Sequence, residues 1–222
     1  MERSELQSTS QMPVNDRRDV AYGQATDLTF LDRLGVWLGA RHTRRNAGRL
    51  TGKAIGDFGC GYDARFTRAH LDEVATALLA DVALAPDLKS DPRVTAIEGQ
   101  LPDSLAALPT ASLDLVLCIS MLEHLWEPER MLSECRRLLA PGGRLLVSVP
   151  TWLDKRLLEF VGFRLHINAF EVEDHKRYYT RRDLWLMLRR AGFSPSRTRC
   201  SHFKFGLAIF AVCTVEDQPS EP

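Results

Sequence analysis

The sequence predicts an α/β protein built on a mostly parallel sheet with helices on both faces. Between Lys53 and Pro150, short apolar runs alternate with helical patterns, which is typical of parallel strands buried on both faces. Near the C-terminus, two further apolar runs are separated by a short turn, which favours an antiparallel hairpin. A chain of 222 residues is long enough to bury a core, and we expect one domain.

The composition is that of an ordinary globular protein, with 45% hydrophobic and 26% charged residues. The 29 basic and 29 acidic residues cancel, so no overall positive field favours nucleic acid as a partner. Residues 53–149 are acidic on balance and both flanks are mildly basic. This distribution is a hint of an anionic substrate, although a mixed solvated surface explains it as well.

The cysteines and the lengths of the apolar runs indicate in which cellular compartment we expect the protein. The five cysteines are an odd number without a CxxC pair, which favours reduced thiols in the cytoplasm over a disulfide framework. Cys118 and Cys213 lie in apolar runs and are expected in the core. Met1–Arg18 lacks the apolar stretch of a signal peptide, and no run is long enough for a transmembrane segment.

The N-terminal region reads as a tail followed by a helix. Residues 1–19 are polar and are expected to fray. Apolar side chains at helical spacing predict a helix from Asp27, a plausible N-cap, to Arg41. The basic stretch Arg44–Gly52 is then expected to connect this helix to the first strand.

The middle of the chain predicts five strands, and a Pro-Gly-Gly turn is expected to end the last helix before the fifth strand. The expected strands are Lys53–Phe58, Ala75–Ala80, Val94–Glu98, Leu113–Ile119 and Arg144–Val149, with helices over Ala64–Glu73 and Glu127–Ala140. Beyond Pro150, the pattern predicts helices over Trp152–Phe160 and Arg181–Ala191, the latter capped by Thr180, and strands over Thr198–Phe205 and Leu207–Val215.

The chemistry is concentrated where predicted strands end. Asp57-Phe58-Gly59-Cys60-Gly61 lies between a strand and a helix, where glycines let the backbone approach a ligand closely. The third glycine of a dinucleotide fingerprint is missing, and the carboxylate of Asp57 suits a cationic ligand better than a phosphate. Asp81 ends the next strand, where an acid can bind ribose hydroxyls, cap a helix or face solvent.

These segments, in this order, resemble a class I S-adenosylmethionine-dependent methyltransferase. The resemblance rests on Asp57–Gly61, Asp81, Leu113–Leu117, Leu122-Glu123-His124-Leu125 and Leu138–Gly143, and it covers Lys53–Pro150. It implies a Rossmann-like seven-stranded sheet and S-adenosyl-L-methionine as cofactor. The sequence departs from the family pattern in two places, where Asp63 replaces a glycine and Gln100 stands where an Asp often meets adenine.

The resemblance also implies roles for individual residues. The backbone of Gly59, Cys60 and Gly61 would contact the amino-acid portion of the cofactor, and Asp57 would orient its ammonium group. Asp81, with the adjacent Val82, would bind the ribose. Gln100 and Leu101 would meet the adenine, since the amide oxygen of glutamine also accepts a hydrogen bond from an amine. Ser120 would lie near the methionine part.

Two histidines are the candidate catalytic bases, because the pKa of histidine suits removal of a hydroxyl proton. His124 follows the fourth strand, and His175 lies in Asp174–Thr180, which resembles the acceptor-facing segment of methyltransferases from bacterial glycan and secondary-metabolite gene clusters. Packing of His124 under the sheet edge, and docking of the second segment by Tyr178 and Tyr179, are the alternatives. No spacing typical of a metal site is present.

We therefore predict a cytoplasmic, biosynthetic methyltransferase, acting as a monomer or homodimer on a small-molecule hydroxyl in an anionic or sugar-containing acceptor. N- or C-methylation, and a non-catalytic cofactor-binding or scaffold protein, are the alternatives. The predicted domain spans residues 20–215, with an N-terminal helical segment (20–52), a cofactor-binding core (53–150) and an acceptor or lid segment (151–180). Residues 216–222 are expected to form a second tail.

Overall fold

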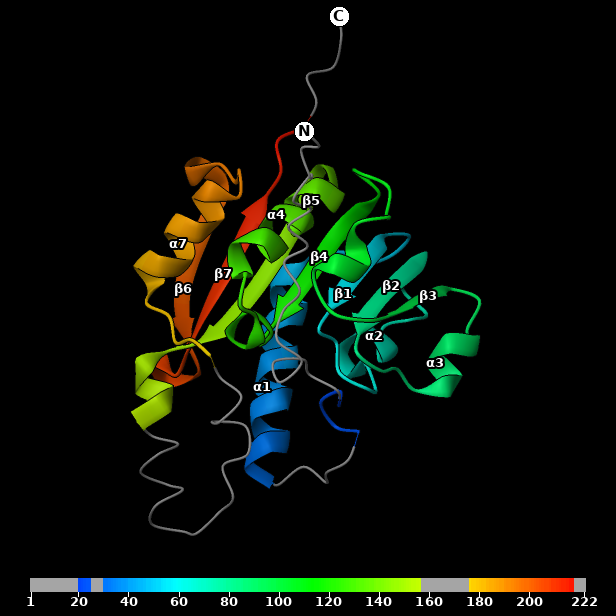
Figure 1. The fold of residues 1–222 in the computed structure, drawn as a ribbon, viewed down its shortest axis with the longest axis horizontal. Helices are drawn as coiled ribbons and strands as arrows, with labels where there is room; N and C mark the ends of the chain where they lie inside the picture. The colour runs from blue at the N-terminus through cyan, green and yellow to red at the C-terminus, as the bar shows by residue number, and fades with distance from the viewer. Residues whose placement is uncertain (1–19, 25–29, 157–175, 218–222) are drawn as a thin grey trace, which may run out of the picture.

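The computed structural model describes residues 20–24, 30–156 and 176–217, and its strands form one seven-stranded sheet (Figure 1). The strands are β1 (Ala54–Phe58), β2 (Thr76–Asp81), β3 (Val94–Glu98), β4 (Leu113–Ile119), β5 (Leu139–Pro150), β6 (Thr198–Phe203) and β7 (Ala208–Thr214). Their order is β3-β2-β1-β4-β5-β7-β6. β1 to β5 pair in parallel, and β7 is antiparallel to β5 and β6. The predicted fold class is confirmed.

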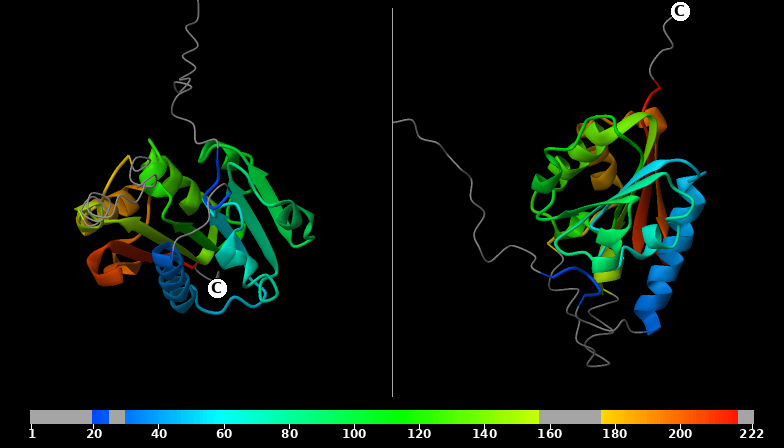
Figure 2. Two further views of the ribbon diagram at one scale, coloured as in Figure 1. Left: turned by 90° about the horizontal axis from the view of Figure 1, so that it is seen from below. Right: turned by 90° about the vertical axis from the view of Figure 1, so that its right-hand side faces the viewer.

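Helices cover both faces of the sheet (Figure 2). The helices are α1 (Phe30–Ala47), α2 (Arg65–Arg68), α3 (Pro86–Ser90), α4 (Pro128–Leu138) and α7 (Arg181–Arg190), and short 3-10 turns include η3 (Leu122–His124) and η5 (Lys204–Gly206). One core lies under α4 and α7 and includes Met131 and Leu184 with Cys118 of β4. The other core includes Ala47 of α1 and Leu88 of α3. Cys118 and Cys213 are both fully buried, as predicted.

The order of the strands defines where a ligand can bind. From β1 the sheet is built outward through β2 and β3 on one side and through β4 and β5 on the other. In open sheets of this kind, the connections that follow β1 and β4 run in opposite directions. A crevice then opens at the carboxyl ends of these two strands. The segments after β1, β2 and β4 therefore surround the expected binding site.

The helices differ from the prediction more than the strands do. α1 continues past Arg41 to Ala47, because nothing breaks the helix before Gly48, whose φ of 75° ends it. α2 stops at Arg68 instead of Glu73, since His70 and Glu73 donate their backbone N–H groups to residues only three positions earlier, in tight turns. The five-residue α3 was not predicted, because it is too short to show a helical period.

The predictions for the segments on either side of the fifth strand also differ in part from the structure. The segment Pro141–Gly143 does not separate helix from strand, because β5 already begins at Leu139 and contains it. The pairing of β4 with β5 shifts between Leu113 and Leu115, so the extra residues form a bulge. The predicted helix over Trp152–Phe160 is present in residues 152–156, and its remainder lies outside the described residues, as do Asp27 and the predicted tail 1–19.

Candidate cofactor site

A tight loop at the carboxyl end of β1 forms the centre of the candidate site. Gly59 and Gly61 have φ values of 69° and 73°, which an L side chain rarely adopts. The backbone N–H of Gly59 donates to the carbonyl of Ala80 at 2.8 Å, which ties the loop to the end of β2. The side chain of Cys60 is half-buried, with its sulfur 3.9 Å from the same carbonyl oxygen, and burial raises the pKa of the thiol.

Asp81, the last residue of β2, is fixed directly against this loop. It is 6% exposed, and its Oδ2 accepts the backbone N–H of Gly61 at 2.8 Å. Its Oδ1 accepts the backbone N–H of Val82, also at 2.8 Å. A carboxylate can accept about four hydrogen bonds, so Asp81 keeps acceptor capacity for hydroxyl groups. Both bonds hold the carboxylate in one orientation at the edge of the crevice.

Asp57 lies behind the loop and is the second buried acid. Its Oδ2 accepts the hydroxyl of Thr67, on α2, at 2.7 Å. Burial raises its pKa to about 6; the bond from Thr67 opposes this shift, and the charge of Asp81 adds to it. Two buried carboxylates that repel each other favour a cation nearby. The ammonium and sulfonium groups of S-adenosylmethionine are such cations, so the acids of this site fit that cofactor.

The segment after β4 lies against the glycine loop. A Cβ atom built on Gly59 would come within 2.3 Å of Met121 Cγ, so the two segments are in close contact. Ser120 has a φ of 51°, an uncommon value for a serine, and its N–H donates to the carbonyl of Ser148 at 2.9 Å. Ser120 is exposed at this edge, where a ligand on the loop would meet it.

Gln100 and Leu101 reach the same edge from β3. The backbone N–H of Gly99 donates to the carbonyl of Asp81 at 3.0 Å, which joins the segment after β3 to the end of β2. The side chain of Gln100 is exposed and that of Leu101 is half-buried against the core. The segments that carry the predicted cofactor-binding residues therefore leave adjacent strands at one edge of the sheet.

The N-terminal segment covers the outer side of the glycine loop, which sequence reasoning missed. The carbonyl of Tyr22 accepts the backbone N–H of Tyr62 at 3.0 Å, and Ala21 is 2% exposed. A Cβ on Gly61 would lie 3.1 Å from the carbonyl oxygen of Tyr22. The only sequence signal was the Tyr22-Gly23 pair, and Gly23 has a φ of 81° in the turn Ala21–Gln24.

Of the two candidate catalytic histidines, only His124 is among the described residues. His124 is half-buried in η3, and its N–H donates to the carbonyl of Met121 at 3.1 Å. His175 lies outside the described residues. The next residue, Lys176, donates its N–H to the carbonyl of Glu123 at 2.8 Å, and the hydroxyl of Tyr179 donates to the carbonyl of Leu122. The segment beginning at Lys176 is thus bound to the segment that carries His124.

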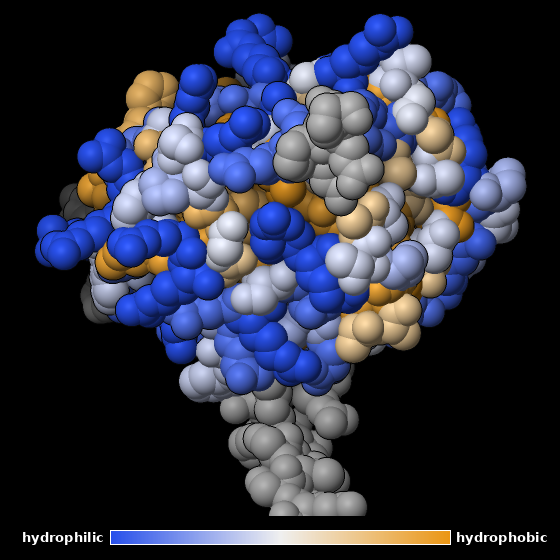
Figure 3. Space-filling model, turned by 90° about the horizontal axis from the view of Figure 1, so that it is seen from above, coloured by the Kyte–Doolittle hydropathy of each residue, from blue (hydrophilic) through white to orange (hydrophobic). Residues whose placement is uncertain are grey.

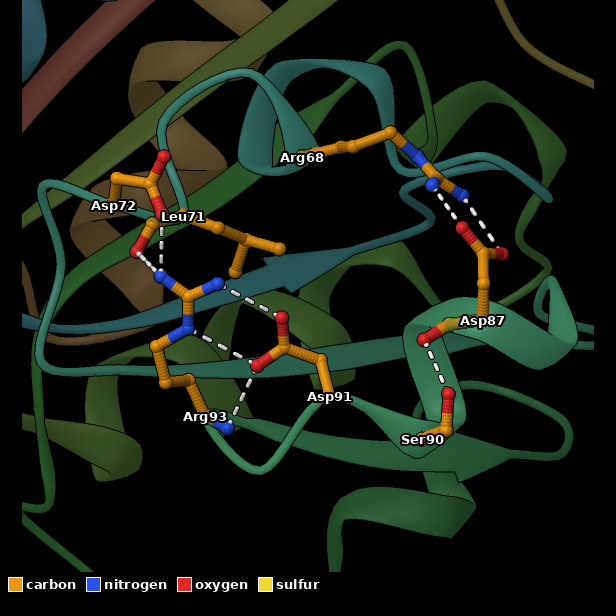
Figure 4. Close-up of polar contacts among 7 residues, drawn as sticks. All are labelled: Arg68, Leu71, Asp72, Asp87, Ser90, Asp91 and Arg93. Atoms are coloured by element: carbon orange, nitrogen blue, oxygen red, sulfur yellow. Dashed lines mark hydrogen bonds and ion pairs between the residues drawn. The ribbon is translucent and has the colours of Figure 1, made fainter.

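Two arginines fasten the segments that connect β1 to β3 (Figure 4). Arg68 donates from Nε to the carbonyl of Asp63 at 3.0 Å, and its guanidinium forms a bidentate ion pair with Asp87 of α3. The pair joins the end of the glycine loop to the connection after β2. Arg93 likewise binds Asp91, Asp72 and the carbonyl of Leu71, which fastens the turn after α2 to the start of β3 (Figure 4).

The opposite end of the molecule has a different character. A hollow of about 460 Å³ lies at the amino ends of β4 and β5, lined by residues that include Thr110, Arg136 and Asp217. Hydrophilic side chains predominate over the end of the molecule seen from above in Figure 3. The hollow is remote from the glycine loop, and its arginines and aspartate carry opposite charges. Its lining of two arginines and two acids differs from the glycine loop, where Asp57 and Asp81 are the buried charged groups.

In residues 20–24, 30–156 and 176–217, three or more His, Cys, Asp or Glu side chains nowhere come together in a group able to hold a metal ion. Among the helices of these same ranges, none combines the length and apolar character needed to cross a membrane.

Comparison with known proteins identifies the family. Residues 39–196 match the family described as "Methyltransferase domain". A "Probable S-adenosylmethionine-dependent methyltransferase" of Mycolicibacterium smegmatis is 33% identical over 168 residues, which cover 74% of this chain and 61% of the relative. A ubiquinone biosynthesis O-methyltransferase of Xanthomonas oryzae is 36% identical over 108 residues, 45% of this chain and 44% of that protein. The chain thus spans about half the length of these relatives.

A solved structure supports the fold. Magnesium protoporphyrin IX methyltransferase from Synechocystis, with bound S-adenosylhomocysteine, aligns with a TM-score of 0.58 at 18% identity, over 86% of this chain and 90% of that one. The fold and the acid-lined glycine loop define a class I methyltransferase. The chain belongs to the family of S-adenosylmethionine-dependent methyltransferases, and the predicted enzyme class and cofactor are confirmed at the level of that family.

Proposed function

We propose that this protein transfers a methyl group from S-adenosylmethionine to a hydroxyl oxygen of a small molecule. The observation that carries the proposal is the arrangement of Asp81, which is held on the N–H of Gly61, beside the buried Asp57. The preference for oxygen is supported by the relatives named ubiquinone biosynthesis O-methyltransferase, one of which is 36% identical over the matched segment.

We assign the cofactor-binding roles to the residues that the sequence indicated. Gly59, Cys60 and Gly61 hold the amino-acid portion, with its ammonium toward Asp57. Asp81 and Val82 hold the ribose, Gln100 and Leu101 the adenine, and Ser120 the methionine part. When bound, the cofactor supplies an electrophilic methyl group on a sulfonium centre. The chain orients the cofactor and the acceptor, and such alignment alone contributes about 7–11 kcal/mol toward lowering a barrier.

A hydroxyl acceptor also needs a group that takes its proton. We propose His175 or His124 for this task, with a slight preference for His175 because of its place in the predicted acceptor segment. The hydrogen bond from Lys176 to Glu123 supports a shared location, since each residue is next to one of the histidines in sequence. The proton moves from the acceptor oxygen to an imidazole nitrogen and then to solvent.

The proposed organisation is one methyltransferase domain over residues 20–215. Residues 20–52 lead into the core, residues 53–150 bind the cofactor, and residues 151–180 face the acceptor. The contact of Tyr22 with Tyr62 supports the inclusion of the N-terminal segment in this domain. We further propose that the protein acts in biosynthesis in the cytoplasm, because its cysteines lack a disulfide pattern.

The test has two stages. Calorimetry with S-adenosylhomocysteine should show binding in the micromolar range or tighter, and its absence contradicts the proposal at the first stage. Cofactor carrying a ¹³C-labelled methyl group is then incubated with a fractionated metabolite extract of the source cells. The chemical shift of the transferred carbon distinguishes O-, N- and C-methylation. Binding without transfer to any fraction indicates a non-catalytic cofactor-binding protein.

A further inference from the structure

The segment after β5 and the β6–β7 turn are fastened together at the edge of the sheet where the cofactor site lies. The N–H of Thr151 donates to the carbonyl of Leu207 at 2.9 Å, and its hydroxyl donates to the carbonyl of Gly206 at 2.8 Å. The N–H of Asp154, in the helical segment 152–156, donates to the same hydroxyl oxygen at 3.4 Å. These bonds hold Asp154 close to the turn that carries Lys204.

The β6–β7 turn has two non-glycine residues with positive φ, and the side chain of one of them, Lys204, is half-buried. Lys204 and Phe205 have φ values of 50° and 56°, which cost energy for residues other than glycine. Phe205 is 97% exposed, whereas Lys204 is half-buried. The ammonium of Lys204 lies against α1, 3.9 and 3.7 Å from where a Cβ would stand on Gly35 and Gly39. The two glycines thus leave room for the buried end of the lysine.

Lys204 and Asp154 are half-buried charges, and the ammonium of Lys204 lies over the ring of Phe203, 5.3 Å from its centroid. Within the part of the chain that the structure describes, neither side chain forms a hydrogen bond or an ion pair. Their charges nevertheless influence each other. Burial raises the pKa of Asp154 to about 6 and Lys204 opposes the shift, while burial lowers the pKa of Lys204 against the charges of Asp154 and Glu123. Keeping such groups from water is unfavourable unless something pairs with them.

We propose that Lys204 and Asp154 bind the acceptor, Lys204 holding an anionic group and Asp154 accepting a hydrogen bond from a hydroxyl. This inference rests on the proposed function. The pair stands beyond the carboxyl end of β5, which is the neighbour of β4 and its exposed Ser120. Carboxyl ends of parallel strands are where ligands bind in such sheets. The acceptor class that fits is a hydroxylated small molecule carrying a carboxylate or a phosphate.

The experiment separates a metabolite extract of the source cells by anion exchange and incubates each fraction with enzyme and methyl-labelled cofactor. We expect label in compounds retained on the resin, and phosphatase treatment of that fraction distinguishes a phosphate from a carboxylate. Lys204→Met should raise KM for the labelled compound about 10–100-fold, the loss expected for a charge-assisted bond. Lys204→Arg should restore part of it, and Asp154→Asn should also raise KM.

Two comparisons make the result specific. Lys53→Met, at the far end of β1 and paired with Asp114 at 2.9 Å, should leave KM unchanged. S-adenosylhomocysteine affinity should be the same in the wild type and in Lys204→Met, which also shows that the variant is folded. Label only in the unretained neutral fraction, or an unchanged KM in Lys204→Met, overturns the inference. Cofactor binding with no labelled fraction overturns the proposed function itself.

Discussion

The carboxylate of Asp81 accepts the backbone N–H of Gly61 at 2.8 Å, across 20 residues of sequence. Together with the bond from the N–H of Gly59 to the carbonyl of Ala80, this bond joins the end of β2 to the glycine loop after β1. Because both groups belong to the proposed cofactor site, a change at Asp81 alters both a ligand contact and the position of the loop.

Replacing Asp81 with alanine should weaken S-adenosylhomocysteine binding by about 1–3 kcal/mol, the usual loss for bonds to a charged group. Calorimetry measures this directly. Asp72→Asn is the matched control, since the Asp72 side chain is 98% exposed and lies away from the loop. An affinity that stays the same in Asp81→Ala removes this residue from the site.

Gly61→Ala should be more damaging than Gly52→Ala. Both glycines have a φ of 73°, so both substitutions carry the same backbone strain, of about 1–2 kcal/mol. Only at Gly61 does the new Cβ meet another group, 3.1 Å from the carbonyl of Tyr22, whereas Gly52 has nothing within 4 Å. Gly61→Ala should therefore lower both stability and cofactor affinity, and Gly52→Ala stability alone. Thermal unfolding and calorimetry on both variants test this, and equal effects would contradict it.

Cofactor affinity should fall below pH 6 because of Asp57. Its pKa is raised to about 6, and only the ionised form attracts the ammonium of the cofactor. S-adenosylhomocysteine binding should thus weaken up to about tenfold between pH 7.5 and pH 5. In the free protein the sign is opposite, because the raised pKa gives stability that is present below about pH 4 and is lost as the pH rises through 6.

Asp57→Asn is the variant that isolates this group. It should remove most of the pH dependence of binding while leaving a uniformly weaker affinity. A pH profile in Asp57→Asn that matches the wild type assigns the effect to another group, and Asp154, whose pKa is also raised to about 6, is then the next to substitute.

Loss of the histidine base should lower turnover without weakening cofactor binding. His175→Gln or His124→Gln should lower turnover about 10²–10⁴-fold and leave cofactor affinity nearly intact. His202→Gln, on the exposed face of β6, serves as the control. The acidic limb of the pH–rate profile should disappear in the variant that has lost the base. Turnover within a few-fold of the wild type in both variants excludes both histidines as the base.

The strands were predictable because their sequence signal is local. Val94–Glu98 and Leu113–Ile119 have the predicted bounds, since each apolar run is flanked by turn residues. The juxtaposition of Asp57, Gly59, Gly61 and Asp81 was predictable for a related reason, because the ends of adjacent parallel strands meet at one edge. The ends of the helices were harder to predict from the sequence, because the length of α1 depends on a glycine cap and that of α2 on local turns.

Two parts of the proposed sites depend on contacts that no short pattern encodes. Tyr22 reaches Tyr62 only through the path of the N-terminal segment, and the sequence suggested instead that the space beside Gly61 was left for a ligand. Lys204 and Asp154 are 50 residues apart and lie near each other because Thr151 binds the β6–β7 turn. Neither relationship follows from periodicity or spacing.

The central place of β1 has a consequence for motion. β1 pairs with β2 on one side and with β4 on the other, so its backbone amides and those of its neighbours are enclosed by the sheet. Amides in such strands exchange with solvent only on the rarest, near-global openings, whereas those of edge strands such as β3 and β6 exchange through local fraying. The loop at Gly59–Gly61 and Ser120, with its positive φ, are thus attached to the slowest-opening part of the molecule. Fraying at the edges should therefore leave the glycine loop and Ser120 in place, while fraying of β3 should reach Gln100 and Leu101, which follow that edge strand.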